Sequence, residues 1–198
     1  TNLTDAVRCV AWSPDGHYLA AADGPTVRLW NTLSWQMLKQ WRDPTDSRYC
    51  LTFSPDSRRL AAVGYGPGIW MYDVQALVPA PVVNTDFNFL SVTFSPDNRF
   101  LVTGARHEGP RIWLRNRLSF ERVANTTVWG GSMRSVSFAK HGSQLVTAIE
   151  QSKHVRVLDF DRLLGYRRRR LNGQLLSLNC EYDRMASVSE DGSIQFSS

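Results

Sequence analysis

Large apolar residues recur along the chain at nearly constant intervals. One column of them is separated by 41, 41, 44 and 40 positions and comprises Trp12, Phe53, Phe94, Phe138 and Leu178. A second column lies seven residues further on and repeats the same gaps with Leu19, Leu60, Leu101, Leu145 and Met185. Because two columns share one spacing, the pattern indicates an internal repeat of about 40 residues.

Short polar turns lie between the two columns. Residues 13–16, 54–57 and 95–98 have the sequences S-P-D-G, S-P-D-S and S-P-D-N, and residues 139–142 have A-K-H-G. In such turns Pro fixes φ at about −65°, Asp bonds the nearby backbone, and Gly or Asn accepts a left-handed conformation. The segments beside the turns alternate with period two, as at Val10, Ala11 and Trp12. Each unit is therefore predicted to contain a β-hairpin.

Two further strands are predicted in each unit. Third strands fit residues 27–30, 69–72, 112–114, 155–158 and 193–196, and less apolar fourth strands fit 36–40, 82–84, 120–124 and 166–171. Four strands per repeat, with no helical pattern between them, predict blades of a β-propeller. Tryptophans on the predicted strands are expected to be buried packing residues, namely Trp12, Trp30, Trp70 and Trp113.

These features resemble the tryptophan-aspartate (WD) repeat family. The matching residues are the S-P-D turns, the strand endings at Asn31, Asp73 and Asp159, and the pair Asp191 and Gly192. The family's Gly-His pair is absent from every unit, and the Asp between second and third strands remains only as Asp23 and Asp191. The resemblance therefore implies blades that pack through apolar contacts rather than through the family's polar network.

The expected fold is all-β, with four WD-type blades plus most of a fifth in an open or truncated ring. The units fall at about 1–45, 46–86, 87–130, 131–173 and 174–198. The fifth unit stops at Ser198 before a fourth strand. We therefore expect the remainder of the propeller to come from more chain or from a partner, because an open blade exposes unpaired backbone groups.

Composition narrows the class of protein. A hydrophobic content of 42% is enough for a core, and no apolar run approaches the roughly 18 residues of a membrane-spanning helix. With no visible leader, an intracellular protein is expected, cytoplasmic or nuclear, and not transmembrane. Cys9, Cys50 and Cys180 are an odd number without C-x-x-C spacing, which favours buried thiols over a disulfide framework or a zinc site.

No motif indicates catalysis. The chain lacks a G-x-S-x-G elbow, a phosphate-binding glycine loop before a helix, and H-E-x-x-H, so neither enzyme activity nor a cofactor is expected. His107, Glu108, Glu150 and His154 fall in neighbouring loops, but their spacing matches no known ligand set. No metal site is predicted.

A protein-interaction scaffold is the expected function. If the blades follow the family, the loops that precede the first strands and those that join second to third strands share one face. Aromatic residues and Arg in exposed loops commonly dominate interface energies. The predicted partner-binding residues are Tyr65, Arg106, His107, Glu108, Trp129, Arg134 and Lys153.

An arginine run gives an alternative function. Four of the chain's positive charges are consecutive, and they are Arg167, Arg168, Arg169 and Arg170. With Tyr166 they partly resemble the aromatic-Arg-Arg-Gly motif by which a WD-like propeller subfamily binds phosphoinositide head groups, although Arg169 stands where that motif has Gly. Anionic lipid or nucleic acid is thus an alternative partner. The other interpretation is an outer strand whose charge prevents edge-to-edge pairing.

Overall fold

The computed structural model describes the backbone of residues 6–42, 48–66, 68–83, 88–105, 110–116, 119–125, 133–139, 141–149, 155–160, 169–171, 174–176, 185–188 and 194–197. Side-chain surroundings are described up to residue 160, with gaps at 43–49, 67, 81–87, 106–132, 140 and 149–154. The described residues form β-strands joined by turns and short connections.

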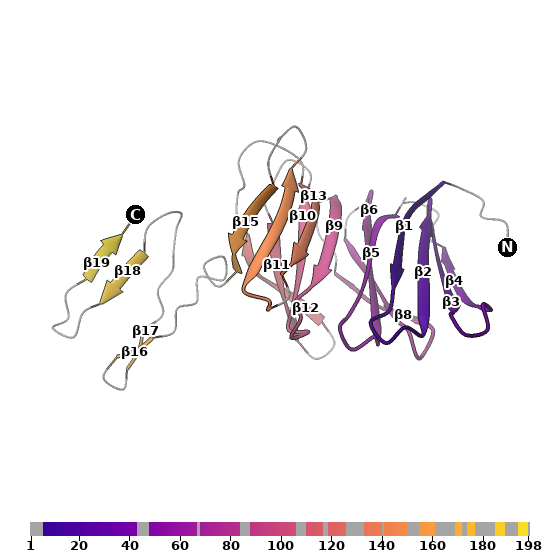
Figure 1. Cartoon of the computed structure of the whole chain (residues 1–198), viewed down its shortest axis with the longest axis horizontal. Helices are drawn as coiled ribbons and strands as arrows, with labels where there is room; N and C mark the ends of the chain where they lie inside the picture. Colours follow the sequence, from indigo (N-terminus) through magenta and orange to yellow (C-terminus); the bar gives the residue numbers. More distant parts are fainter. Residues whose placement is uncertain are drawn as a thin grey trace.

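Three four-stranded antiparallel sheets follow one another along the molecule (Figure 1). Blade 1 consists of β1 (Val7–Trp12), β2 (Tyr18–Asp23), β3 (Thr26–Asn31) and β4 (Met37–Arg42). Blade 2 consists of β5 (Arg48–Phe53), β6 (Arg59–Gly64), β7 (Ile69–Asp73) and β8 (Val78–Val83). Blade 3 consists of β9 (Phe89–Phe94), β10 (Phe100–Ala105), β11 (Pro110–Asn116) and β12 (Ser119–Asn125). In each blade the strands pair in chain order, which confirms the predicted four-stranded meander.

Blade 4 differs from the prediction in its outer strand. The described part of this sheet contains β13 (Met133–Phe138), β14 (Gln144–Ile149) and β15 (Val155–Asp159). The predicted fourth strand at 166–171 is instead represented by β16 (Arg169–Leu171), which pairs with β17 (Gln174–Leu176). Asn172 and Gly173 lie between the two strands in sequence and are outside the described residues, and in the described part of the chain β16 pairs with β17 and not with β15.

The predicted second and third strands of the fifth unit pair with each other. They are β18 (Met185–Val188) and β19 (Ile194–Ser197), and their register runs from Met185 opposite Ser197 to Val188 opposite Ile194. The all-β fold with propeller-type blades is therefore confirmed in the described residues.

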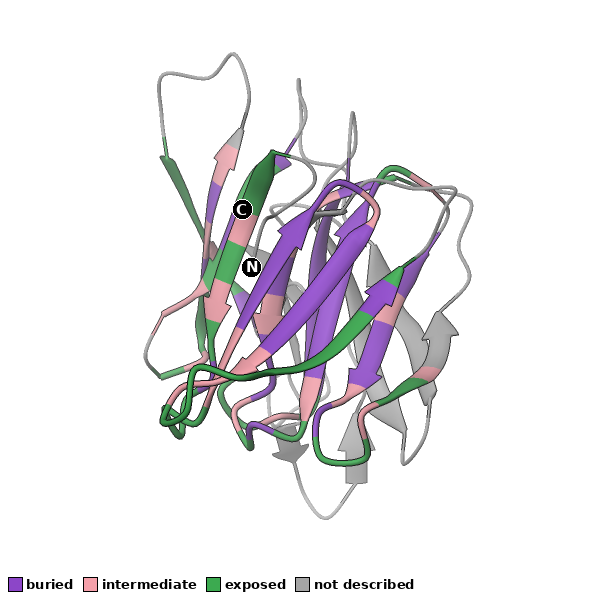
Figure 2. Ribbon diagram, turned by 90° about the vertical axis from the view of Figure 1, so that its right-hand side faces the viewer, coloured by how far each residue is buried: buried purple, intermediate pink, exposed green. Residues whose placement is uncertain are grey.

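Burial depends on the place of each strand in its blade. In blade 1 the middle strands β2 and β3 are buried over most of their length, whereas outer β4 is exposed at every position except Trp41. Figure 2 shows this contrast as buried middle strands beside exposed outer strands and turns. Val27 and Leu29 of β3 belong to a cluster with residues of blade 2, so burial of this face depends on the neighbouring blade.

The S-P-D turns share one hydrogen-bond pattern. In blade 2, Ser54 Oγ donates to Asp56 Oδ1 at 2.5 Å and accepts the Arg59 N–H at 2.9 Å. The equivalent bonds occur in the turns of blades 1 and 3. The last turn residue is left-handed in all four blades, with φ of 77°, 58°, 60° and 74° at Gly16, Ser57, Asn98 and Gly142. This is the backbone conformation that the turn sequences predict.

Neighbouring turns also contact one another. The Asp15 N–H donates to Ser57 Oγ at 3.1 Å, and Asn98 Nδ2 donates to Asp56 Oδ2 at 2.6 Å. A Cβ on Gly142 would lie 3.4 Å from Pro96 Cδ. In blades 2, 3 and 4 the left-handed turn residue therefore lies against the turn of the preceding blade, and the first two of these contacts are polar.

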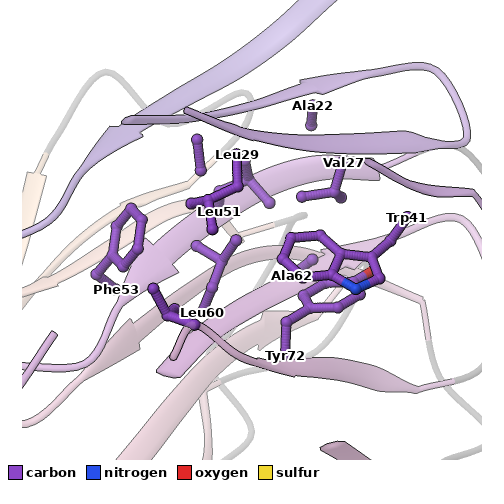
Figure 3. Close-up of a cluster of buried hydrophobic side chains, with 11 residues drawn as sticks. Ala22, Val27, Leu29, Trp41, Leu51, Phe53, Leu60, Ala62 and Tyr72 are labelled. Carbon is purple, nitrogen blue, oxygen red and sulfur yellow. The ribbon is translucent and has the colours of Figure 1, made fainter. Parts of the chain in front are cut away.

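Apolar side chains fill the space between blades 1 and 2 (Figure 3). Val27 and Leu29 from β3 pack against Leu51 and Phe53 from β5 and other residues of blade 2. Trp41 from β4 stacks on Tyr72 from β7, with ring centroids 4.5 Å apart and planes inclined by 30°. The core of the molecule therefore lies between sheets, as expected for propeller blades.

The next two interfaces repeat this arrangement. Ile69 and Met71 of blade 2 join a buried cluster with Phe94 of blade 3, and Val102 of blade 3 joins one with Leu145 of blade 4. Apolar packing between blades is thus confirmed as the main contact. A polar contact lies inside blade 1, where buried Asp23 forms an ion pair with Arg28 and Arg28 Nε donates to Gln40 Oε1 at 3.3 Å.

Trp12 corrects the prediction that all strand tryptophans are buried. Phe53 and Phe94, its equivalents, are each 6% exposed because each contacts the preceding blade. Trp12 is 54% exposed and meets Trp35 edge-on at a centroid distance of 6.2 Å. In the described part of the chain no strand covers this face of β1, so the same column position is buried only where a preceding blade exists.

The burial of the other strand tryptophans, and of β15 in the last described blade, also depends on neighbouring strands. Trp30 and Trp70 are half-buried, and the side chain of Trp113 lies outside the described residues. On β15, Val155 and Val157 are 65% and 59% exposed. The equivalent residues on β3 and β7 are buried against the following blade. They are Val27 and Leu29 on β3, and Ile69 and Met71 on β7.

We predict that Phe94→Ala and Trp12→Ala differ in their effect on stability although both residues occupy one column. Phe94→Ala should lower the free energy of unfolding by about 3 to 4 kcal/mol, because it empties a site between two blades. Trp12→Ala should lower it by less than about 1 kcal/mol, since its ring is largely in water. Urea titrations measure both values, and equal losses would contradict the assigned burial.

Gly104→Ala should destabilise the interface between blades 3 and 4. An added Cβ would lie 2.4 Å from Ser91 Oγ and 2.8 Å from Met133 Cγ, and such overpacking costs about 1 to 3 kcal/mol. Thermal unfolding of Gly104→Ala and of Gly104→Ala/Ser91→Ala measures the effect. The second variant should regain part of the lost stability because it removes Ser91 Oγ, the nearest atom. If Gly104→Ala unfolds at the same temperature as the wild type, the interface tolerates the methyl group and the prediction is wrong.

Candidate functional site

The first strand of every blade contains a β-bulge at the same position. Pairing with the second strand shifts between Val7 and Cys9, Arg48 and Cys50, Phe89 and Ser91, and Met133 and Ser135. The residues passed over are Arg8, Tyr49, Leu90 and Arg134. A bulge leaves one residue outside the regular ladder and changes the direction of its side chain. Each of the four blades therefore has one bulge residue, with a redirected side chain, at the equivalent position of its first strand.

These four first strands lie next to one another in the order β1, β5, β9 and β13. Three of their bulge residues, Arg8, Leu90 and Arg134, line a pocket of about 290 Å³ together with Ala6 and Val7. We call this pocket the inner hollow. Two exposed arginines thus bracket an apolar residue at the inner hollow.

Strand register determines which loops surround the inner hollow. Val7 lies opposite Asp23, and Met133 lies opposite Ile149, so each first strand starts where the second strand of its blade ends. The loops that precede first strands and the loops that join second to third strands therefore lie at one end of the blades, as the family resemblance implies. The S-P-D turns lie at the opposite end.

Tyr65 stands in the turn between β6 and β7 at this end and is 46% exposed. The next residue, Gly66, has φ of 106° and donates its N–H to Asn88 Oδ1 at 2.9 Å. Asn88 directly precedes β9 in blade 3. A hydrogen bond between two blades therefore holds the backbone beside Tyr65, which leaves an aromatic side chain in solvent on a fixed support.

The structure describes two of the seven predicted partner-binding residues. Tyr65 and Arg134 are exposed and lie at the same end, and Arg134 lines the inner hollow. The remaining five lie outside the described residues, and they are Arg106, His107, Glu108, Trp129 and Lys153. The sequence prediction missed Arg8 and Asn88. Arg8 was detectable, because it stands four residues before Trp12, as Arg134 stands four before Phe138.

Little of the arginine run is described. Tyr166, Arg167 and Arg168 lie outside the described residues, whereas Arg169 and Arg170 begin β16 and are opposite Leu176 and Leu175. Within the part of the chain that the structure covers, no group of three or more His, Cys, Asp or Glu residues is placed to hold a metal ion. The described residues also contain no helix with the length and apolarity needed to span a membrane.

Two thiols lie directly beyond the bulges of β1 and β5. Cys9 and Cys50 are half-buried and free, so the predicted buried thiols are partly accessible. A hydrogen bond from the Cys50 thiol and one from the Leu51 N–H, at 3.2 Å, lower the pKa of Cys9 to about 6 although burial opposes the shift. The same hydrogen bond to Cys9, with burial, raises the pKa of Cys50. Cys9 therefore loses its proton first.

Two stretches of the chain match a known family description. The model for "WD domain, G-beta repeat" matches residues 2–31 and 84–113. These matches cover blade 1 from its start to the end of β3 and the equivalent part of blade 3. They contain Arg8 and Leu90 of the inner hollow.

Relatives of known name match over part of their length. Protein FIZZY-RELATED 2 of Arabidopsis thaliana is 33% identical over 119 residues, which are 56% of this chain and 24% of the relative. Target of rapamycin complex subunit LST8 of Bos taurus is 34% identical over 103 residues, covering 50% of this chain and 31% of the relative. The matched stretch is thus about a quarter to a third of the length of these relatives.

Solved structures share the fold. A chain in the crystal structure of the Mitotic Checkpoint Complex superposes with a TM-score of 0.71 and 16% identity, covering 77% of this chain and 48% of that chain. The Cps50 (Swd1) beta-propeller domain of Myceliophteria thermophila gives a TM-score of 0.67 and 15% identity, covering 77% of this chain and 53% of that one. At these identities the likeness establishes architecture alone.

The alkylation rate of Cys9 should depend on pH with a midpoint near 6, because the thiolate is the reactive form and its pKa is about 6. The rate should rise from pH 5 and level off above pH 7, whereas an ordinary thiol rises around pH 8.5. Cys50→Ala, which removes the hydrogen-bond donor, should shift the midpoint upward. Cys50→Ser, which keeps an O–H donor, should shift it less. Iodoacetamide labelling followed by mass spectrometry measures the profile, and a wild-type midpoint near 8.5 would contradict the assignment.

Proposed function

Because the chain belongs to the WD-repeat β-propeller family, we propose that it is a non-enzymatic protein-interaction scaffold that binds a partner at the inner hollow and the loops around it. The convergence of Arg8 and Arg134 on one pocket carries this proposal. The same end of the blades holds Tyr65 on a fixed turn. We expect the protein to act inside the cell.

The residue types fit a protein partner. Guanidinium groups bind carboxylates through two parallel hydrogen bonds, and Arg and Tyr are enriched among the residues that dominate interface energies. Leu90 gives the inner hollow an apolar wall between the two charges. A peptide segment that places an acidic side chain next to an apolar one would match both features.

The exposed lining of the inner hollow, more than its volume, favours a macromolecular partner. Sites for small molecules commonly enclose roughly 300 to 1,000 Å³ and bury most of the ligand. The inner hollow has about 290 Å³ and is lined by exposed residues of β1 and β13. It therefore suits one or two side chains that project from a larger surface.

The relatives support a role in assemblies. One is named as a subunit of the target of rapamycin complex, and a structural neighbour belongs to a mitotic checkpoint complex. We propose that this chain likewise works as a component of a protein complex.

Replacing the two arginines should weaken partner binding without unfolding the protein. In affinity purification of the full chain, Arg8→Ala/Arg134→Ala should recover specific partners at least about tenfold less than wild type, because each lost anchor typically costs more than 1 kcal/mol. Tyr65→Ala should give a smaller loss, and the melting temperature should be unchanged, since all three residues are exposed.

Arg58→Ala provides the matched control. Arg58 is also exposed but lies at the S-P-D end of blade 2, so its removal changes charge without touching the proposed surface. Equal loss of partners in the control and the double variant would show a general charge effect and contradict the proposal. In parallel, binding to phosphoinositide liposomes that is lost in Arg167→Ser/Arg168→Ser would favour the anionic-ligand alternative.

A further inference from the structure

Cys9 and Cys50 occupy equivalent positions on adjacent strands of different blades. Each directly follows the bulge residue of its strand, β1 or β5, and the two strands are in contact. Both sulfurs lie 4.0 Å from one atom, the Leu51 carbonyl oxygen. The geometry therefore brings two thiols that are 41 residues apart in sequence to one place between blades 1 and 2.

The repeat itself does not require sulfur at this position. The corresponding residues of blades 3 and 4 are Ser91 and Ser135, and Ser91 Oγ donates to the Met133 carbonyl oxygen at 3.4 Å. A hydroxyl therefore serves the same structural place. The thiol pair at the first interface is a chemical difference within an otherwise repeated framework, and Ser is a conservative replacement at both positions.

The two sulfurs have complementary states for thiol chemistry. Cys9 accepts a hydrogen bond from the Leu51 N–H, and with its pKa near 6 it is mainly thiolate at neutral pH. Cys50 has a raised pKa and remains protonated. An accessible thiolate is the nucleophile toward peroxides, and a neighbouring thiol captures the first oxidation product. Both cysteines are half-buried, which leaves room for a small oxidant to approach.

We propose that Cys9 and Cys50 form a peroxide-sensitive thiol pair that closes to a disulfide between blades 1 and 2. The Cys9 thiolate attacks hydrogen peroxide; the O–O bond breaks, an S–O bond forms, and hydroxide leaves and takes up a proton as water. The resulting Cys9 sulfenic acid is attacked by the Cys50 sulfur; the S–S bond forms, the S–O bond breaks, and the Cys50 proton leaves with the oxygen as water. In total two thiols lose two electrons, and one peroxide is reduced to two waters.

The disulfide would connect the inner strands of two blades beside the inner hollow. Cys9 adjoins Arg8, which lines that pocket, so the modification lies next to the surface proposed for partner binding. The inference itself does not rest on that function. It concerns the chemistry of the two sulfurs and is tested without a partner.

The test uses the full chain with Cys180→Ser in every sample, so that only two thiols remain. After treatment with hydrogen peroxide and blocking of free thiols, trypsin should release residues 9–28 joined to residues 49–58. In Cys50→Ser the Cys9 sulfenic acid has no thiol to react with. Trapping of Cys9 by dimedone should therefore be at least about tenfold greater in Cys50→Ser than in the protein that keeps Cys50.

Cys9→Ser is the reciprocal control. It removes the thiolate and keeps Cys50 in its buried surroundings, which raise the pKa of that thiol, so peroxide should oxidise Cys50 at least about tenfold more slowly than it oxidises Cys9 in Cys50→Ser. Circular dichroism checks that each Ser variant is folded before oxidation. Absence of the joined peptide, equal dimedone trapping with and without Cys50, or disulfides formed only between molecules would overturn the proposal.

Discussion

Burial of apolar residues between neighbouring blades is the constraint on which this structure depends. A blade cannot cover its apolar interface residues by itself, so β3 of blade 1 packs against β5 of blade 2, where Val27 and Leu51 share one cluster. The same rule explains the ends of the described row. Trp12 and Val157 belong to columns that are buried elsewhere, and they are exposed where no described blade covers them. Stability is therefore a property of interfaces rather than of single repeats.

This packing also positions the candidate site. Because the first strands line up as β1, β5, β9 and β13, a bulge repeated in each strand places Arg8, Leu90 and Arg134 around one pocket. The residue type at the bulge position is weakly constrained, because the backbone of that residue is left out of the ladder. A fixed framework with variable bulge residues is well suited to recognition, because new contacts do not disturb the core. The two cysteines directly follow the bulge residues of β1 and β5, so the same alignment of first strands brings them together.

The sequence predicts the repeated parts of this molecule better than the singular ones. Turn residues such as Ser54 and Asp56 recur in register, so local chemistry is enough to assign their role. Trp12 shows the limit, because its burial depends on a neighbour and not on its own strand. The pairing of β16 with β17 is a local one that the repeat pattern does not predict. That Arg8 and Arg134 line one pocket, and that Cys9 and Cys50 lie close together, could be found only from the spatial order of the strands.

The contacts between the S-P-D turns have a consequence for the identity of each blade. The first joint uses a backbone N–H and a serine hydroxyl, at Asp15 and Ser57. The second joint uses an amide and a carboxylate, at Asn98 and Asp56. At the third joint Gly142 faces the ring of Pro96 without a side chain of its own. Blades that share one architecture thus make different contacts between their turns, so these contacts specify the order of the blades along the chain. Exchanging two blades would leave mismatched hydrogen-bond donors and acceptors.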